Sequence, residues 1–498
     1  MSVFNNWYSS YQASNPEKFN NEFIYGRNTN EDLKAILEDV CKSLEIINGI
    51  TFKGVEIEED QTKFIQTGYV PLEESRVIQA RLNFHIRSHS AINPAEMEEG
   101  DVSVPVFFPK LTDNFYYTIG GAKYYAVLQI LDRGVYNTNK GISLKTLMMP
   151  INLKCSKAAF SDISNGELHG SSINVDLFKK NVNSITYFFA KFGSIEGLKY
   201  FGFDPDKLLI DPATIDVKNV PANVRVFDLA AKGKLRYVFN MNEVTEDWQT
   251  DFLVTFLDFA KTYKITYDDI YEDSLTKWLK TLGKTFTSTN PHLMEQKGLS
   301  ILCSLERILD DRTKKNLIHI ADHDKADTYS IIRWCFTFYH PLSQEENMDL
   351  KNKRLRLSEY LVYPLIRKFS DGAYRAITNS RRANFSSLKS IFTSINPDFC
   401  LKKLITSKML RYSSAVNSFD LFVGLKASQT GPQGLANGVG SELAVKYRGH
   451  HESYIGNVGM NACSAGDPGM TMTLTPFVKL DGFFFSTEQQ YVTKFKPS

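Results

Sequence analysis

The sequence has few cysteines and no long apolar run. Its six cysteines, at positions 41, 155, 303, 335, 400 and 463, form no CxxC pair, so a zinc knuckle is not expected. Scattered cysteines of this kind are typical of a reducing, cytoplasmic setting. No segment reaches the roughly 18 apolar residues of a membrane-spanning helix. The first residues also lack the basic-then-apolar order of a signal peptide.

Signatures of a complete catalytic site are missing as well. We find no Ser/His/Asp or Cys/His nucleophile motif and no acidic triad of the DxDxD kind. The acidic residues of "YDDIYEDS" (Asp268, Asp269, Glu272 and Asp273) offer oxygen ligands for Mg²⁺. Acids are also favoured at a helix N-terminus by the helix dipole, and we prefer this interpretation. No metal site is therefore expected in this chain.

Two further candidates match their motifs poorly. His319 and His323 are four residues apart, but the glutamate of an HExxH site is absent, and we interpret the segment as a surface turn. The stretch "GPQGLANGVGSE" matches neither GxGxxG nor GxxxxGK[ST], and no strand is expected before it. A phosphate-binding loop of either class is therefore not predicted.

A strong charge asymmetry is hidden beneath a small net charge. The chain has 58 Lys and Arg against 56 Asp and Glu, a net charge of +2. Residues 351–450 hold 17 of the basic and 5 of the acidic residues, a local +12, so the remainder carries 41 and 51, or −10. A concentrated basic segment is typical of a polyanion-binding surface. The alternative is a solvated surface with chance clustering.

The length of 498 residues predicts two to four domains, and the patterning predicts a multidomain α+β protein. "NEDLKAILEDVCKSLEII" has helical spacing with Asn30 or Asp32 as cap, and "GITFKGVEIEE" alternates like a strand. An apolar helix is expected over residues 122–131. "WQTDFLVTFLDFAKTYK" and "GLSILCSLERILDD" predict helices, and residues 351–415 are expected to be mostly helical.

The helical pattern ends near Gly424. Ten of the 29 glycines fall between Gly424 and Met472. Glycine lets backbone approach a ligand closely. A long irregular stretch of this kind is usually functional or disordered, and its interleaved aromatic and aliphatic residues favour function.

Four segments, in this order, resemble the N-terminal half of the β (second-largest) subunit of multisubunit DNA-directed RNA polymerases. They are "VPVFFPKLTDNFYYTIGGAKYYAVLQILDRG", "NKRLRLSEYL", "LRYSSAVNSFDLFVGLKASQTGPQGL" and "HHESYIGNVGMNACSAGDPGMTMTLTPFV". The first is similar to a strand followed by F-I-I-N-G-x-E-x-V, and the third to a stretch ending in G-P-x-G-L. In the fourth, Ser464 to Pro468 replace the family's Glu-Thr-Pro-Glu-Gly. The drift resembles that of giant-phage polymerases with a split β subunit.

The resemblance implies a domain organisation. Residues 1–138 correspond to the first part of the protrusion, 139–350 to the lobe, 351–410 to the returning part of the protrusion, and 411–498 to the glycine-rich fork beside the hybrid and downstream DNA. Together these modules would form one wall of the DNA cleft. The holoenzyme would transfer nucleotidyl groups with Mg²⁺ held by a β′-like subunit, and this chain would hold no cofactor and no catalytic residue.

The resemblance also implies contact residues. Nucleic-acid contacts fall on Arg411, Lys426, Gln429, Lys446, Arg448, Arg354 and Arg356, and the fork loop contains Gly431, Pro432, Gly434, Asn437 and Asp467. Lys426 stands for the family's paired arginines. For Arg354 and Arg356, a hinge role or an ion pair is an alternative. Cationic side chains on phosphates would set affinity and register without reading sequence.

The expected partners are a C-terminal β-like subunit, β′-like subunits, a promoter-specificity factor, template DNA and the transcript, with no membrane. The host cytoplasm is the expected location, and packaging in the virion stays open. The competing hypothesis is a non-enzymatic nucleic-acid-binding or structural phage protein. A stand-alone polymerase or nuclease ranks third.

Overall fold

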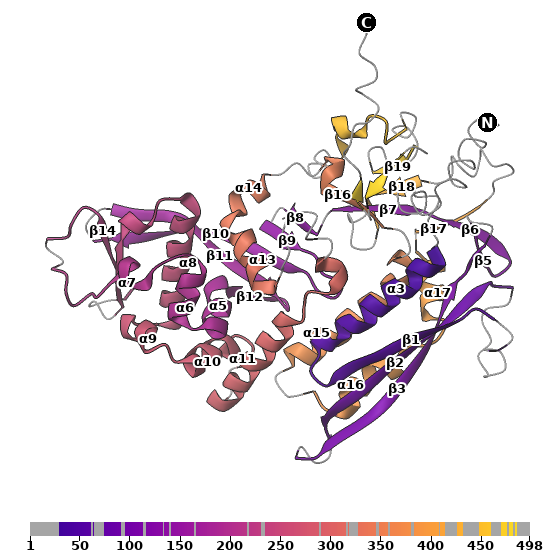
Figure 1. Cartoon of the computed structure of the whole chain (residues 1–498), viewed down its shortest axis with the longest axis horizontal. Coiled ribbons are helices and arrows are strands. Elements are labelled where there is room, and N and C mark those ends of the chain that lie inside the picture. The colour runs from indigo at the N-terminus through magenta and orange to yellow at the C-terminus, as the bar shows by residue number, and fades with distance from the viewer. Residues whose placement is uncertain are drawn as a thin grey trace, which may run out of the picture.

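The structure is a computed structural model of the chain. It describes residues 29–60, 63, 74–90, 95–112, 116–132, 134–138, 141–163, 166–216, 219–230, 235–287, 290–314, 317, 327–344, 348–356, 359–379, 383–407, 409–413, 426–431, 448–459, 470–475, 478–481 and 484–485. Four sheets and their covering helices confirm the predicted α+β class. Figure 1 shows them as two large groups of elements joined by smaller sheets.

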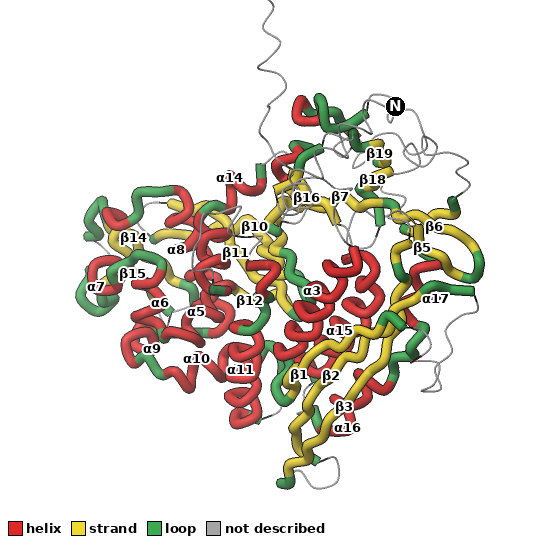
Figure 2. Tube along the Cα trace, turned by 45° about the vertical axis from the view of Figure 1, so that its right-hand side comes forward, coloured by secondary structure: helices red, strands yellow, loops and turns green. Residues whose placement is uncertain are grey.

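A three-stranded antiparallel sheet forms the first group. Its strands, in order, are β1 (Ile50–Glu58), β2 (Val77–His89) and β3 (Met97–Pro109). In β2, alternate residues are buried because successive side chains point to opposite faces; these are Ile78, Ala80, Leu82, Phe84 and Ile86. That face lies beneath helices, as Figure 2 shows.

The covering helices supply an aromatic core. They are α3 (Thr29–Lys42), which continues into η2 (Ser43–Ile46), α15 (Glu359–Thr378) and α16 (Phe385–Thr393). Phe84 of β2 lies 6.2 Å from the Phe369 ring and 4.5 Å from the Phe392 ring. On the opposite face, Leu401 of α17 (Phe399–Ile405) packs with Val77 and Phe107. The predicted N-terminal helix is confirmed, although it begins at Thr29, before both proposed capping residues.

An eight-stranded sheet and nine described helices form the second group. The strands are β8 (Val135–Thr138), β9 (Gly141–Leu144), β10 (Ile151–Asp162), β11 (Gly166–Leu177), β12 (Lys180–Asn183), β13 (Leu209–Ile210), β14 (Val224–Asp228) and β15 (Arg236–Asn240). The helices are α5 (Ser184–Phe192), α6 (Ser194–Tyr200), α7 (Pro205–Leu208), α8 (Asp247–Tyr263), α9 (Tyr267–Glu272), α10 (Leu275–Lys284), α11 (Pro291–Glu306), α13 (Thr328–Thr337) and α14 (Tyr339–Ser343), with η4 at Met241–Glu243. Helices α8 and α11 confirm two predictions, but α11 begins at Pro291 and ends at Glu306.

The segment predicted as a helix over residues 122–131 forms two strands instead. These strands are β6 (Ala122–Ala126) and β7 (Leu128–Asp132), and Val127 connects them. Each strand has neighbours on both sides, β5 and β17 for β6 and β16 and β18 for β7. The helix prediction was wrong because β16, β17 and β18 come from distant sequence, and local periodicity carries no information about them.

These strands belong to two small sheets near the top of Figure 1. The four-stranded sheet has the order β17 (Leu410–Tyr412), β6, β5 (Tyr116–Ile119), β4 (Leu111–Thr112). The six-stranded sheet has the order β19 (Thr471–Thr473), β18 (Lys426–Ser428), β7, β16 (Lys353–Arg356), β21 (Phe484–Phe485), β20 (Leu480–Asp481), with η5 (Leu350–Asn352) and η6 (Glu452–Tyr454) nearby. Helices α15 to α17 confirm the largely helical prediction for residues 351–415, apart from β16 and β17.

Five of the six cysteines lie in the described part of the chain. Cys41, Cys155, Cys303, Cys335 and Cys400 are free thiols, and Cys463 lies outside the described residues. Burial raises the pKa of Cys335 to about 12. Within the described part of the chain, no helix is long and apolar enough to cross a membrane.

Candidate nucleic-acid interface

The six-stranded sheet brings together the four segments that carry the sequence resemblance. Strands β7, β16, β18 and β19 come one from each segment. Strand β7 is central: it pairs antiparallel with β16, with Gln129 opposite Arg356, and parallel with β18, with Gln129 opposite Ser428. Strand β18 in turn pairs with β19, with Lys426 opposite Thr473. Segments far apart in sequence therefore share one hydrogen-bonded scaffold.

A buried ion pair anchors this sheet to α15. The Arg354 guanidinium donates from Nη1 to Glu359 Oε2 at 2.9 Å and from Nη2 to Glu359 Oε1 at 3.3 Å. Both side chains are less than a tenth exposed. Although burial opposes ionisation of Glu359, the charges of Arg354 and Arg356 hold the pKa of its carboxyl well below the usual range. The pair fixes the chain where β16 leads into the helix.

Arg356 is fully buried and bonded within the same network. Its Nη1 donates to Gln129 Oε1 at 2.9 Å, and its guanidinium carbon lies 5.4 Å from the centre of the Tyr363 ring. Burial lowers the pKa of Arg356 to about 10, so it stays charged at neutral pH. Burial, together with the positive charges of Arg356 and Arg354, lowers the pKa of Lys145 to about 7.

The two arginines therefore differ from the surface cations with which they were grouped. A buried guanidinium already bonded to protein acceptors is not free to bind a phosphate of the nucleic-acid backbone. Their environment supports the alternative, an internal ion pair that holds β16 against α15 and β7. Neighbouring Lys353 is also buried, and its ammonium lies 2.6 Å from Asp132 Oδ1 on β7.

Three predicted contact residues lie at accessible positions. Arg411 on β17 and Arg448 are exposed, and Lys426 on β18 is half-buried. None of the three forms an ion pair with another residue in the described part of the chain. Cations left unpaired at a surface are available for phosphate oxygens.

The four-stranded sheet adds a cation that the sequence analysis missed. Arg411 pairs with Tyr125 on β6, and Lys123 lies two residues before Tyr125. Side chains two apart on a strand share a face, so the exposed Lys123 and Arg411 are diagonal neighbours on one face. The Lys123 ammonium lies 5.2 Å from the centre of the Tyr116 ring. The wrong helix prediction for 122–131 concealed this pairing.

Of the remaining predicted residues, Gln429 is buried, Gly431 is half-buried, and the others lie outside the described part of the chain. The backbone N–H of Gln429 donates to Met470 O at 2.8 Å. Pro432, Gly434, Asn437, Lys446 and Asp467 lie outside the described residues. Strand β18 ends shortly before Gly431, so the expectation of no strand before this loop was wrong. The mismatch with both phosphate-loop consensus patterns is unchanged.

Asp268 and Asp269 lie in the first turn of α9, which confirms the helix-terminus role preferred from the sequence, whereas Glu272 is the last residue of this helix and Asp273 is its C-cap. Thr266 caps α9: its hydroxyl accepts from the Asp269 N–H, while the Asp269 carboxylate accepts from the Thr266 N–H. Asp273 accepts from the N–H and the hydroxyl of Ser194. Among the described residues, no group of three or more His, Cys, Asp or Glu could hold a metal ion. His319 and His323 lie outside them.

Gly431 provides a test of how tightly the chain after β18 packs against Gln129 of β7. Its φ is +132°, and a Cβ there would lie 2.9 Å from both Gln129 Nε2 and Met409 Sδ. Gly431→Ala is therefore expected to lower the free energy of unfolding by about 1–3 kcal/mol, since backbone strain and crowding add. Urea unfolding checks this, with Gly202→Ala as control, because Gly202 also has positive φ but an added Cβ meets nothing within 4 Å. Equal losses would show that crowding contributes nothing.

The structure is thus a multi-sheet α+β scaffold with exposed cations on two neighbouring strands, β6 and β17. Residues 3–493 match the family described as "Non-virion RNA polymerase subunit". The match covers nearly the whole chain, and the protein belongs to this family. It is thus a subunit of an RNA polymerase, whose partners include other polymerase subunits. No curated protein is similar enough to count as a relative.

Proposed function

We propose that this chain is the N-terminal β-like subunit of a split, phage-type multisubunit RNA polymerase. In this proposal, residues 1–138 and 351–410 form a protrusion, 139–350 a lobe and 411–498 a fork. Together they build one wall of the DNA cleft and position template, RNA–DNA hybrid and downstream duplex. The enzyme acts in the cytoplasm of the infected host, in line with the family's description as non-virion.

The assembly of β7, β16, β18 and β19 into one sheet is the observation that carries this proposal. Each strand lies in a different segment of the β-subunit resemblance, in matching order. Four chance matches along nearly 500 residues would have no reason to meet in space. Their convergence supports a common scaffold beneath the fork loop.

The chemistry of the proposed enzyme divides between chains. Mg²⁺ ions held by the β′-like partner would activate the RNA 3′ hydroxyl and stabilise the leaving pyrophosphate. This chain's own residues would hold the nucleic acid in place: Lys123, Arg411, Lys426, Lys446 and Arg448 on phosphates, and Gly431 to Asn437 as the fork loop. Such cations fix the register of the strands without selecting their sequence. A C-terminal β-like subunit and a promoter-specificity factor complete the assembly.

Reconstitution tests this proposal directly. The tagged chain is co-expressed with its genomic neighbours, purified as a complex and assayed for NTP incorporation on a primed RNA–DNA scaffold. NTP incorporation is expected only when the C-terminal β-like subunit and the β′-like subunits are present. Activity of the isolated chain, or a monomer that recruits no polymerase subunit, would contradict the proposal in favour of another nucleic-acid-binding role.

The variant Lys426→Ala refines the test. Removing one charge-assisted phosphate contact is expected to weaken scaffold binding about tenfold and to lower the salt slope by about one. The matched control is Lys284→Ala, because Lys284 is an exposed lysine on α10. Equal effects of the two variants would remove Lys426 from the interface.

A further inference from the structure

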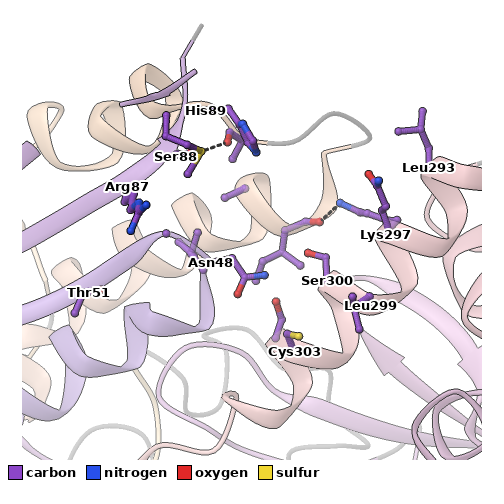
Figure 3. Close-up of a pocket in the computed structure, with 18 of the residues that line it drawn as sticks. Asn48, Thr51, Arg87, Ser88, His89, Leu293, Lys297, Leu299, Ser300 and Cys303 are labelled. Carbon is purple, nitrogen blue, oxygen red and sulfur yellow. Dashed lines mark hydrogen bonds between the residues drawn. The ribbon is translucent and has the colours of Figure 1, made fainter. Parts of the chain in front are cut away.

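A groove of about 900 Å³ lies between the two large groups of elements. Strands β1 and β2 form one wall and α11 the other. Figure 3 shows Arg87, Ser88 and His89 on one side and Leu293, Lys297 and Ser300 on the other. The groove is at the upper end of the size range of binding pockets in proteins. It is separate from the six-stranded sheet described above.

Hydrogen bonds beside the groove join the two groups of elements. Ser304 Oγ donates to Ile46 O at 3.1 Å, and Arg307 Nη1 donates to Glu45 O and Asn48 Oδ1, both at 3.3 Å. Lys297 Nζ donates to the carbonyls of Ile377 and Asn379, at the end of α15. Both walls are thus fixed before any ligand arrives, which reduces the entropy lost on binding.

Large apolar side chains remain exposed along this groove. Met97 is 50% exposed, Leu293 44% and Leu299 54%. They are three of the nine large hydrophobic side chains exposed in the described part of the chain, and they line one groove. On α11, residues 293, 296, 300 and 303 follow helical spacing along the wall. Exposed apolar side chains gathered in this way mark an interaction surface.

The charge of the lining favours an acidic ligand. The lining contains Arg87, Lys297, His85 and His89, but no aspartate or glutamate. Lys297 donates to two backbone carbonyls, and no carboxylate of the described residues forms an ion pair with it. Acids do stand beyond the rim on β3: Glu99 lies 3.9 Å from Arg87, and Asp101 bonds His85 and Lys53. The Arg87 pair is well exposed and therefore weak.

We propose that this groove docks an apolar segment with acidic side chains from another subunit of the polymerase. The proposal rests on membership in a family of polymerase subunits, and it does not require the β-like assignment. Apolar side chains would cover Met97, Leu293 and Leu299, and carboxylates would face Lys297 and Arg87. A single nucleic-acid strand fits poorly, because the lining has no Phe, Tyr or Trp on which bases stack.

Photo-crosslinking in the assembled polymerase tests the proposal. A photoreactive amino acid replaces Leu299 in the groove, or Leu275 on α10 as control, which is 48% exposed and outside the lining. Leu299 is expected to cross-link to a peptide of another polymerase subunit that contains both apolar and acidic residues. Leu275 is expected not to give that product. A cross-link to nucleic acid, to a second copy of this chain or to no subunit would overturn the proposal.

Substitution supplies a second readout. With the photoreactive residue moved to Met97, Leu293→Asp/Leu299→Asp should lower the yield of the intersubunit product at least about tenfold, because apolar burial is lost and carboxylates repel. Leu275→Asp should leave it unchanged. Circular dichroism confirms that the variants fold. An unchanged yield in the folded double variant would also overturn the proposal, whereas loss of NTP incorporation alone concerns the proposed cleft function.

Discussion

Glu359→Ala is expected to lower the free energy of unfolding by about 3–5 kcal/mol, the largest stability effect we predict for a single charge. The carboxylate accepts two hydrogen bonds from Arg354, and both side chains are almost fully buried. Its removal leaves Arg354 and Arg356 charged inside the protein without their counter-ion. Urea unfolding followed by circular dichroism measures the loss. The expected loss comes from the arginine charge that remains buried. The double variant Arg354→Leu/Glu359→Leu removes one of these charges and should therefore lose less stability than Glu359→Leu.

The same carboxylate gives the pair a defined pH dependence. The folded state lowers the pKa of Glu359 from the ordinary 4.5. Its contribution to stability is therefore fully present above about pH 4.5 and is lost as the pH falls towards the folded pKa. The wild-type chain should lose more stability below this pH than Glu359→Gln does. Parallel pH profiles of the two proteins would contradict a charged Glu359.

Lys123→Glu/Arg411→Glu is expected to weaken scaffold binding by the reconstituted polymerase more than any other surface change we propose. The two cations are diagonal neighbours on one face of the four-stranded sheet. Removing two phosphate contacts should lower the magnitude of the slope of log affinity against log salt by about two. Affinity should fall by more than about tenfold. Fluorescence anisotropy across a salt series measures both quantities.

A charge-matched variant separates this effect from net charge. Lys284→Glu/Lys389→Glu makes the same change at exposed lysines on α10 and α16. It is expected to alter the slope little. If both double variants weaken binding equally, the effect reflects the total charge of the chain and the four-stranded sheet is not the contact surface.

Sequence periodicity correctly predicted the elements whose own residues alternate between a buried and an exposed face. Alternation in β1 and helical spacing in α3 and α8 survive in the structure, because each pattern places its apolar residues on a single face. Residues 122–131 have no pattern that selects one kind of element by itself. Their tyrosines and aliphatic residues suit either element, and pairing with β16, β17 and β18 made the strand the stable choice.

The sequence by itself determined the basic segment, the order of the four motifs and the membership in a polymerase family. Only the tertiary structure distinguished Arg354 and Arg356 from Arg411, although all three belong to the same basic stretch. Burial depends on which distant residues pack around a side chain, and here Gln129 and Glu359 surround two of the arginines while the third stays at the surface. The groove beside α11 likewise exists only because β2 and α11, far apart in sequence, are held together in space.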